Sequence, residues 1–436
     1  MSHPQVHGVV LLVRNGDRTE LYQDPNTYKT GSVETTALGE VQSHLLGSYL
    51  RSLYLDSNSP SHIRGLRTDL VDTKQVHVRV KAGGEGTVVF DSAIALLQGL
   101  FPPTSNNKIV LANETEVIAP LGGYQYVPLE TVEPYNDRSL ESWTDCPAFQ
   151  KHISKVYGSD KFKDMAKAAA PFLRDVKDFV YNTPVTMENM VHDFISSELV
   201  HNRSYAHRLP PTFIEQSQHW ANLHEAAVFT DKDMAGIGHI ASRTILRSIL
   251  GAFERIVYNG DPLQLYVQEV TYQPIISLLS QTDVLDEHPE LAGIPNFASA
   301  IAIELRKGDE GDSRDYLRFK FKNGTSHDFQ TVSVFGKGGD IALTEFIYRL
   351  ENSVINNNAE WKSVCGASKL ETVYGTSTQA GFVGLSLLLF FIFAFLFARF
   401  KRSKARTGYV KLGEPTGFGQ AQFVRNVSCR PSCRIP

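Results

Sequence analysis

An apolar run that ends in two arginines constrains this chain more than any other feature. Residues 9–13 (Val-Val-Leu-Leu-Val) predict a short buried strand. The chain then continues Arg14-Asn15-Gly16-Asp17-Arg18-Thr19-Glu20. Two guanidinium groups around a glycine turn suit a tetrahedral oxyanion, because each group can donate two parallel hydrogen bonds. The sequence therefore predicts an anion site at the end of the first strand.

Two later blocks have the same strand-then-polar character. A predicted strand at residues 75–80 carries Arg79, and residues 91–93 (Asp-Ser-Ala) lead to Gly-Leu-Phe-Pro at 99–102. A third predicted strand, residues 263–267, is followed by Gln268-Glu269-Val270-Thr271-Tyr272-Gln273-Pro274. Together the three blocks resemble the histidine acid phosphatases, whose signatures are R-H-G-x-R-x-P, a second arginine before S-A and G-L-F-P, and H-D-x-x-x-x-P.

The chain departs from that pattern at the two histidine positions and at the acidic position, which carry out catalysis in the family. Asn15 replaces the nucleophilic histidine, and its amide nitrogen has no free lone pair with which to attack phosphorus. With Pro274 fixing the register, Gln268 replaces the second histidine and Glu269 replaces the acidic proton donor. A register shifted by one places Glu269 on the histidine and Val270 on the aspartate. Glu20, in place of proline, would repel a phosphate if it faced the pocket.

The resemblance implies an α/β fold with a mostly parallel central sheet, helices on both faces (phosphoglycerate-mutase-like) and a helical cap. It also implies phosphate binding by Arg14, Arg18, Arg79 and Gln268 in one pocket, with Glu269 as a possible acid and with no cofactor or metal. We divide the chain into an α/β core (1–133 and 231–360), a cap insertion (134–230), a juxtamembrane stalk (361–379), a transmembrane helix (380–398) and a basic tail (399–436).

Hydrophobic periodicity and turn residues predict further elements. Helices are expected at 36–54, 149–157, 160–180, 234–257 and, as the last before the stalk, 341–352. A hairpin is expected from 298–306 and 316–322. The cap histidines at 192, 201, 207, 219 and 224 are irregularly spaced, which favours surface or capping roles over a metal site.

Residues 380–398 contain no charged side chain and are rich in Leu and Phe. Nineteen helical residues span roughly 28 Å, about one bilayer core. Five basic residues between 399 and 406 place that side in the cytoplasm by the positive-inside rule. Residues 1–7 show no signal-peptide pattern, so we expect either a further N-terminal segment or insertion without a cleaved signal.

The charge distribution and the sequons fit an exoplasmic body. The tail carries nine Lys or Arg and one Glu, a net charge of +8, so the overall −4 leaves −12 for residues 1–398. This acidic body argues against nucleic acid as a partner.

Possible N-glycosylation sites are Asn113, Asn202 and Asn323. Cys146 and Cys365 could pair, although two cysteines alone do not define a disulfide.

Three functions are compatible with these residues. The first is a membrane-anchored pseudophosphatase that keeps a pocket for phosphate or a phosphomonoester. The second is an active phosphomonoester hydrolase with a non-histidine mechanism, and the third is a structural membrane glycoprotein. The substituted histidine positions favour the first.

Overall fold

The computed structural model describes residues 5–82, 87–180, 185–189, 191–258, 260–308 and 311–367, all within one compact unit, Met1–Leu370. The expected transmembrane helix at 380–398 and the tail lie outside these residues. Within them, no helix is both long and apolar enough to cross a bilayer.

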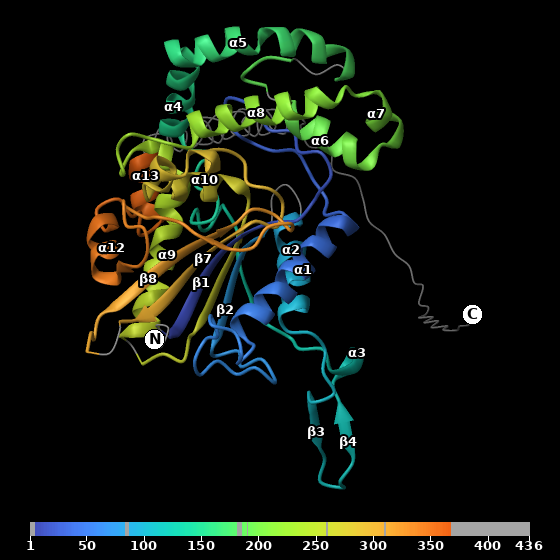
Figure 1. The fold of residues 1–436 in the computed structure, drawn as a ribbon, viewed down its shortest axis with the longest axis vertical. Helices are drawn as coiled ribbons and strands as arrows, with labels where there is room; N and C mark the ends of the chain where they lie inside the picture. The colour runs from blue at the N-terminus through green and yellow to red at the C-terminus, as the bar shows by residue number, and fades with distance from the viewer. Residues whose placement is uncertain are drawn as a thin grey trace, which may run out of the picture. The chain divides into compact units, whose positions relative to one another are not determined.

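A central sheet divides the molecule into two faces (Figure 1). Its strand order is β10-β8-β7-β1-β6-β2-β5, and β9 pairs with β8. The strands are β1 (Val6–Arg14), β2 (Val76–Lys81), β5 (Leu129–Val132), β6 (Leu265–Val270), β7 (Ala300–Lys307), β8 (Asp315–Lys322), β9 (Gln330–Thr331) and β10 (Ile341–Ala342). The half β1-β6-β2-β5 is parallel, as expected. The other half is antiparallel, because β7 runs opposite to β1 and β8 runs opposite to β7.

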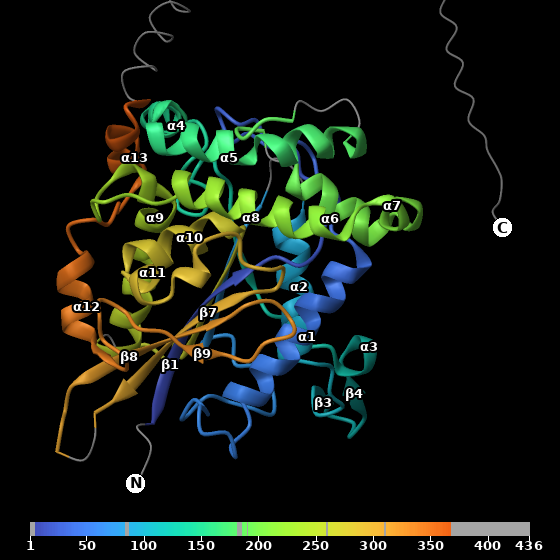
Figure 2. The same cartoon turned by 45° about the horizontal axis from the view of Figure 1, so that its top comes forward.

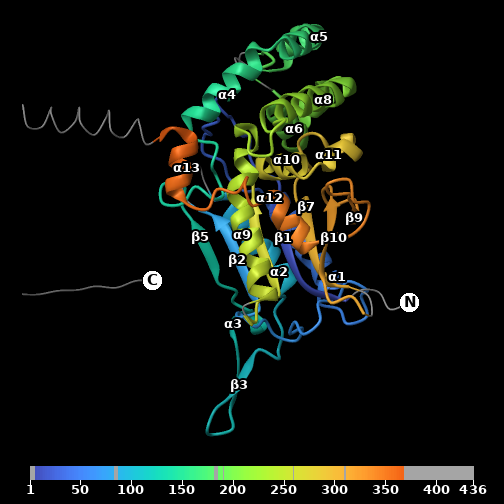
Figure 3. The ribbon, with the colours of Figure 1, turned by 90° about the vertical axis from the view of Figure 1, so that its left-hand side faces the viewer.

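Helices cover both faces of this sheet, which explains why β1 is apolar throughout rather than alternating. Val9 and Leu11 pack with α1 and α2, whereas Val10 and Leu12 pack with α9 and α10 on the face that Figure 3 presents. The helices of the core are α1 (Ala37–Tyr54), α2 (Val88–Leu100), α3 (Pro120–Gly123), α9 (Ile240–Val257), α10 (Tyr272–Gln281), α11 (Val284–Glu287), α12 (Leu343–Leu350) and α13 (Asn358–Cys365).

The cap is a group of helices above the C-terminal ends of the parallel strands (Figure 2). It consists of α4 (Pro147–Gly158), α5 (Asp160–Val176), α6 (His192–His201), α7 (Arg203–Arg208) and α8 (Pro211–Val228). Its helices have their own apolar cluster, which includes Phe162, Phe172 and Ile195. Three short 3-10 helices complete the described helices: η1 (Lys177–Phe179), η2 (Ile237–His239) and η3 (Pro289–Leu291).

The structure corrects three expectations about the core. The third strand runs to Val270, so Gln268 and Glu269 lie inside it rather than after it. The helix expected at 341–352 begins only at Leu343 and is followed by α13, so it is not the last. Residues 361–365 therefore belong to the core and not to a stalk, because Trp361 is buried and Cys365 forms a disulfide with Cys146.

That disulfide joins the start of the cap to the end of the described chain. The two cysteines are 219 residues apart in sequence. A link across so long a loop removes much conformational freedom from the unfolded chain, and such links typically stabilise a fold by about 2–5 kcal/mol.

The three sequons lie in different surroundings. Asn113 is exposed next to the turn between β3 (Lys108–Val110) and β4 (Glu116–Ile118), a hairpin that projects from the end opposite the cap (Figure 1). Asn202 is exposed and caps α7. Asn323 is half-buried, and its Oδ1 accepts a hydrogen bond from the backbone N–H of Asn296 at 2.8 Å.

We predict that Gly47→Ala will destabilise the protein by about 2–3 kcal/mol. A Cβ at Gly47 would lie 2.0 Å from the carbonyl oxygen of Leu96, so α1 and α2 would have to separate. Gly251→Ala, also within a helix, is the matched control. Nothing lies within 4 Å of its Cβ position, so we expect a gain of about 0.5–1 kcal/mol. Denaturant unfolding of both variants measures the difference, and equal stabilities would contradict the close helix contact.

Candidate functional site

A cavity of about 290 Å³ lies between the tip of β1 and the cap, and we call it the cap cavity. Its walls come from the β1 tip and the following residues 20–25, from α6 and α8, and from residues 294–297. Arg14 and Arg18 both line it, as the first motif predicted. Functional side chains in an α/β sheet commonly gather at this end, because the carboxyl ends of parallel strands meet there.

Arg14 is buried at the base of the cap cavity. Its guanidinium carbon lies 4.3 Å from the ring centroid of Phe297 and 5.4 Å from that of Tyr272, and Nη1 donates to the carbonyl oxygen of Pro295. Burial, and then the neighbouring Arg18, lower the pKa of Arg14 to about 9. No carboxylate forms an ion pair with Arg14 among the described residues. The side chain is therefore a cation at neutral pH whose charge is not compensated.

Arg18 has a different electrostatic environment. Its two terminal nitrogens donate to the carboxylate of Asp193 at 2.9 and 2.7 Å, a bidentate pair between the β1 tip and α6. Burial opposes the charge of Arg18, but the Asp193 carboxylate more than offsets this and raises its pKa. The charge of Arg18 is thus already balanced within the protein.

His192, next to Asp193 on α6, also lines the cap cavity. Its Nδ1 lies 3.1 Å from Oγ of Ser217, whose single proton is donated to the carbonyl oxygen of Ile214 at 2.8 Å. With the Ser217 proton donated to Ile214, Nδ1 carries the imidazole proton and the lone pair is on Nε2. Burial, opposed by Asp193 and reinforced by Arg14, lowers the pKa of His192 to about 4. The imidazole is therefore neutral at physiological pH.

The expectation of surface or capping roles was wrong for two cap histidines. His192 lines the cap cavity, and His224 is buried with its Nδ1 3.0 Å from Oε1 of Glu225. Tyr28 donates to that same oxygen at 3.0 Å. The spacing of these histidines gave no sign of this, because the cavity joins residues 14–28 to cap residues that lie at least 160 positions later in the chain.

Acidic side chains surround the arginines. Beyond Asp193, the lining contains Glu20, Asp24, Glu188 and Glu225. Glu20 is exposed, and burial together with Asp193 and Glu198 raises its pKa. With five acidic side chains and two arginines, the cap cavity is unfavourable for a highly charged anion and has one uncompensated cation at its base.

Asn15 lies at the β1 tip and is buried. Its Nδ2 donates to the carbonyl oxygen of Gly16 at 2.8 Å. The side chain lines an adjoining cavity of about 60 Å³, which shares Arg18 with the cap cavity and also contacts Lys81 and Thr271. Asn15 is thus next to the cap cavity, but it is not among the residues that line it.

Gln268 and Glu269 lie within β6 and point to opposite faces of the sheet. Gln268 is fully buried and its Oε1 accepts from Oγ of Ser248 on α9 at 3.0 Å. Glu269 is also fully buried, and neither carboxyl oxygen has a hydrogen-bond partner among the described residues. Burial raises its pKa well above the usual range, which favours the neutral carboxyl group. Neither residue lines the cap cavity.

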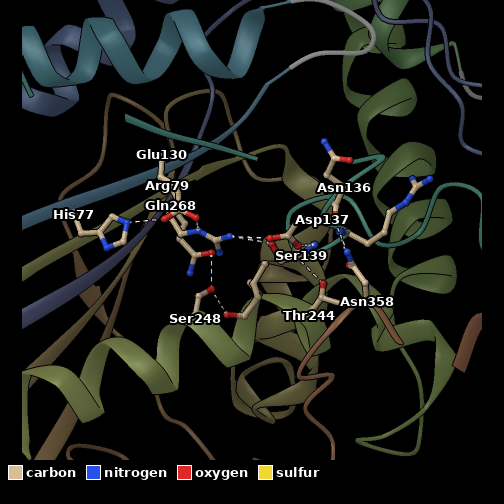
Figure 4. A network of polar contacts seen from close by, with 12 residues as sticks. His77, Arg79, Glu130, Asn136, Asp137, Ser139, Thr244, Ser248, Gln268 and Asn358 are labelled. Atoms are coloured by element: carbon tan, nitrogen blue, oxygen red, sulfur yellow. Dashed lines mark hydrogen bonds and ion pairs between the residues drawn. The ribbon is translucent and has the colours of Figure 1, made fainter. Parts of the chain in front are cut away.

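Arg79 lines a separate cavity of about 510 Å³ between the sheet and α9. Figure 4 shows its guanidinium in a polar network, where Nε donates to Glu130 at 2.9 Å and Nη2 to Asp137 at 3.1 Å. Burial opposes its charge, but Tyr266 and Glu130 more than offset this and raise its pKa.

The predicted residues are therefore not gathered in one pocket. In the sheet register Arg79 is opposite Gln268, whereas Arg14 is opposite Val270. Arg79 is on the same face as Arg14 but two residues short of the strand ends, roughly 7 Å along the strand. The structure brings together Arg14 and Arg18 and adds His192 and Asp193, which the sequence did not indicate.

Comparison with known proteins identifies the fold. No protein-family model matches the sequence, and no curated protein matches it significantly. Among solved structures, the Citrobacter braakii phytase is similar with a TM-score of 0.55 and 13% identity over 82% of this chain and 99% of that one. The Klebsiella sp. ASR1 phytase has a TM-score of 0.54 and 12% identity over 81% and 95%.

A third similar structure is the Hafnia alvei phytase in complex with myo-inositol hexakis sulphate. Its TM-score is 0.53, with 12% identity over 81% of this chain and 98% of that one. At these identities the similarity concerns the fold. The resemblance inferred from the three sequence blocks is thereby confirmed at that level: this chain has the fold of the phytases, which are histidine acid phosphatases.

Proposed function

We propose that this protein is a membrane-anchored pseudophosphatase with the histidine acid phosphatase fold, which binds a phosphomonoester in the cap cavity without hydrolysing it. The observation that carries the proposal is the surroundings of Arg14. An uncompensated cation lies at the base of the cavity, while Asn15, Gln268 and Glu269 do not line it.

The absence of catalytic chemistry rests on these three positions. Asn15 offers an amide whose nitrogen already donates to Gly16 and has no lone pair for attack. A general acid must come within hydrogen-bond distance of the leaving group. Both carboxyl oxygens of Glu269 are buried within the sheet, so Glu269 cannot reach a leaving group in the cap cavity.

The binding function rests on charge. Arg14 can donate to an anion, and its aromatic neighbours Phe297 and Tyr272 hold the guanidinium in place. The Hafnia alvei phytase with this fold binds an inositol sulphate ester, which supports an ester of a tetrahedral anion as the ligand class here. Relative to the expectation from sequence, the proposed site contains Arg14 and Arg18 but neither Arg79 nor Gln268.

The membrane anchor remains a proposal from the sequence. We propose that residues 380–398 span the bilayer, with the tail from Arg399 in the cytoplasm and the phosphatase-like body on the exoplasmic side. Glycosylation at Asn113 and Asn202, both exposed, fits that orientation.

We predict that Arg14→Ala will abolish phenyl phosphate binding, and that Asp193→Asn will strengthen it about tenfold. The first change removes the uncompensated cation. The second removes the negative charge that balances Arg18, while the amide oxygen of Asn can still accept from Arg18 and keep α6 in place. A charge at close range in a partly buried site is worth a tenfold change or more. Isothermal titration calorimetry on the full chain in detergent measures both, and thermal melting without ligand verifies that the Asp193→Asn variant is folded.

Arg79→Ala is the matched control for Arg14→Ala, since it removes a buried arginine from the other cavity. Binding should be unchanged in that variant. If Arg79→Ala abolishes binding and Arg14→Ala does not, the ligand site is the cavity beside α9 and our assignment is wrong.

We also predict negligible turnover of aryl phosphates and no phosphoenzyme after acid or alkaline quenching. Asn15→His alone should recover little activity, because Gln268 leaves no second imidazole. The triple variant Asn15→His, Gln268→His, Glu20→Pro should also recover little, because residue 268 is buried within β6 and neither residue 15 nor residue 268 lines the cap cavity. Turnover of the unmodified protein at roughly 1–10³ per second, typical of enzymes, or a phosphate label on any residue, would show that the protein is an enzyme.

A third prediction concerns topology. Protease added to the cytoplasmic side of sealed vesicles should remove only the basic tail after residue 398, because the large body is protected in the lumen. Permeabilised vesicles are the control, and in them the body should also be cut. Loss of the body from intact vesicles would reverse the proposed orientation.

A further inference from the structure

Two atoms with opposite hydrogen-bonding character are open in the cap cavity. Arg14 Nη2 is a donor and His192 Nε2 is an acceptor, and neither has a hydrogen-bond partner among the described residues. Neither belongs to the polar atoms that are sealed from solvent without a partner. Both residues line the cap cavity, so both atoms are available to a ligand bound in it.

We propose that the cap cavity selects the singly protonated monoanion of a phosphomonoester, whose P–O⁻ oxygen accepts from Arg14 Nη2 and whose P–OH donates to His192 Nε2. This inference rests on the proposed binding function and adds which form of the ligand binds. A dianion offers no proton to Nε2, and a hydrogen-bond acceptor facing a second acceptor is strongly unfavourable in a buried site.

The charges around His192 support this selection. On α6, the negative charge of Asp193 is balanced by its ion pair with Arg18. From the other walls, Glu20, Asp24, Glu188 and Glu225 face the cavity, against Arg14 as the one uncompensated cation among the lining residues described. One positive charge matches a monoanion, whereas the second charge of a dianion would be repelled by the acidic side chains.

The other titratable residues that line the cap cavity do not compete for the lone pair of His192 Nε2. His224 is engaged with Glu225 and Tyr157. Tyr22, Tyr28 and Tyr272 are the remaining titratable residues of the lining. Burial raises the pKa of Tyr28 and Tyr272 well above the usual range, so both stay neutral. His192, whose pKa is lowered to about 4, keeps its lone pair above that pH.

The ion pair Arg18–Asp193 explains how His192 reaches the cavity. It holds the first turn of α6 against the β1 tip, and His192 is the residue before Asp193. The bond from Nδ1 to Ser217 on α8 then fixes the ring so that Nε2 is the free nitrogen. Cap and core thus each supply one of the two ligand contacts.

The test compares methyl phosphate with methyl sulfate on the full chain in detergent. At pH 5.5 both are monoanions of the same shape, and only methyl phosphate carries an acidic proton, since the second pKa of a phosphomonoester is about 6. Calorimetry should give methyl phosphate at least tenfold tighter binding. Between pH 6 and pH 8 the ratio of the two affinities should fall about tenfold per pH unit, because the monoanion is lost in that proportion.

Methyl sulfate serves as the internal control for the acidic side chains, whose titration affects both ligands equally. Below pH 4 the ratio should fall again as His192 becomes protonated. In His192→Leu the preference for methyl phosphate should disappear while methyl sulfate binding persists, and His219→Leu, an exposed histidine of α8 outside the cavity, should behave like the unmodified protein.

Equal binding of the two ligands at pH 5.5, or a ratio independent of pH, would overturn the inference and leave the proposed phosphomonoester site intact. Binding of neither ligand would overturn both. Because the comparison of ligands uses the unmodified protein, the result does not depend on how well the His192 variant folds.

Discussion

The ion pair between Arg18 and Asp193 is the interaction on which the site depends. It joins a residue of the β1 tip to a residue of the cap 175 positions later. One arginine of the pair predicted to bind phosphate is thereby neutralised, and Arg14 is left as the cation that faces the cavity. The same pair fixes the start of α6, which places His192. A single internal contact therefore decides both the charge and the shape of the pocket.

The sheet supplies the rigid base for that contact. β1 lies between β6 and β7, with apolar side chains packed on both faces. The ladders to β6 and β7 on its two sides fix the register of this strand, so its last residue, Arg14, has a fixed position. The β6 strand extends three residues beyond the expected end at 267, and this extension takes Glu269 into the sheet. A buried carboxyl group there, with no hydrogen-bond partner among the residues that the structure describes, contributes nothing to the cavity in which Arg14 lies.

Arg79 shows how one residue type can serve different purposes in one fold. It occupies the β2 position that the sequence pattern assigns to phosphate binding. In the structure the Arg79 guanidinium donates hydrogen bonds to the carboxylates of Glu130 and Asp137, and the side chain lines the cavity beside α9. A charge that is balanced by two carboxylates binds an added anion weakly. Asn15 and Gln268, together with the neutralisation of Arg18 and Arg79, support the proposed monoanion site over a phosphoryl-transfer centre.

The sequence by itself predicted the strands β1, β2 and β6, the β7–β8 hairpin, the helices α1, α4, α5, α9 and α12, and the arginine pair at the β1 tip. These features depend on local periodicity and on residues close together in the chain. It did not determine where Arg79 and Gln268 point, that Asp193 neutralises Arg18, or that His192 enters the cavity. Each of these depends on contacts between segments tens to hundreds of residues apart, and only the tertiary packing of the cap on the sheet brings those segments together. The charge of a site is a sum over such neighbours, so the motif predicted its location and the folded structure decided its chemistry.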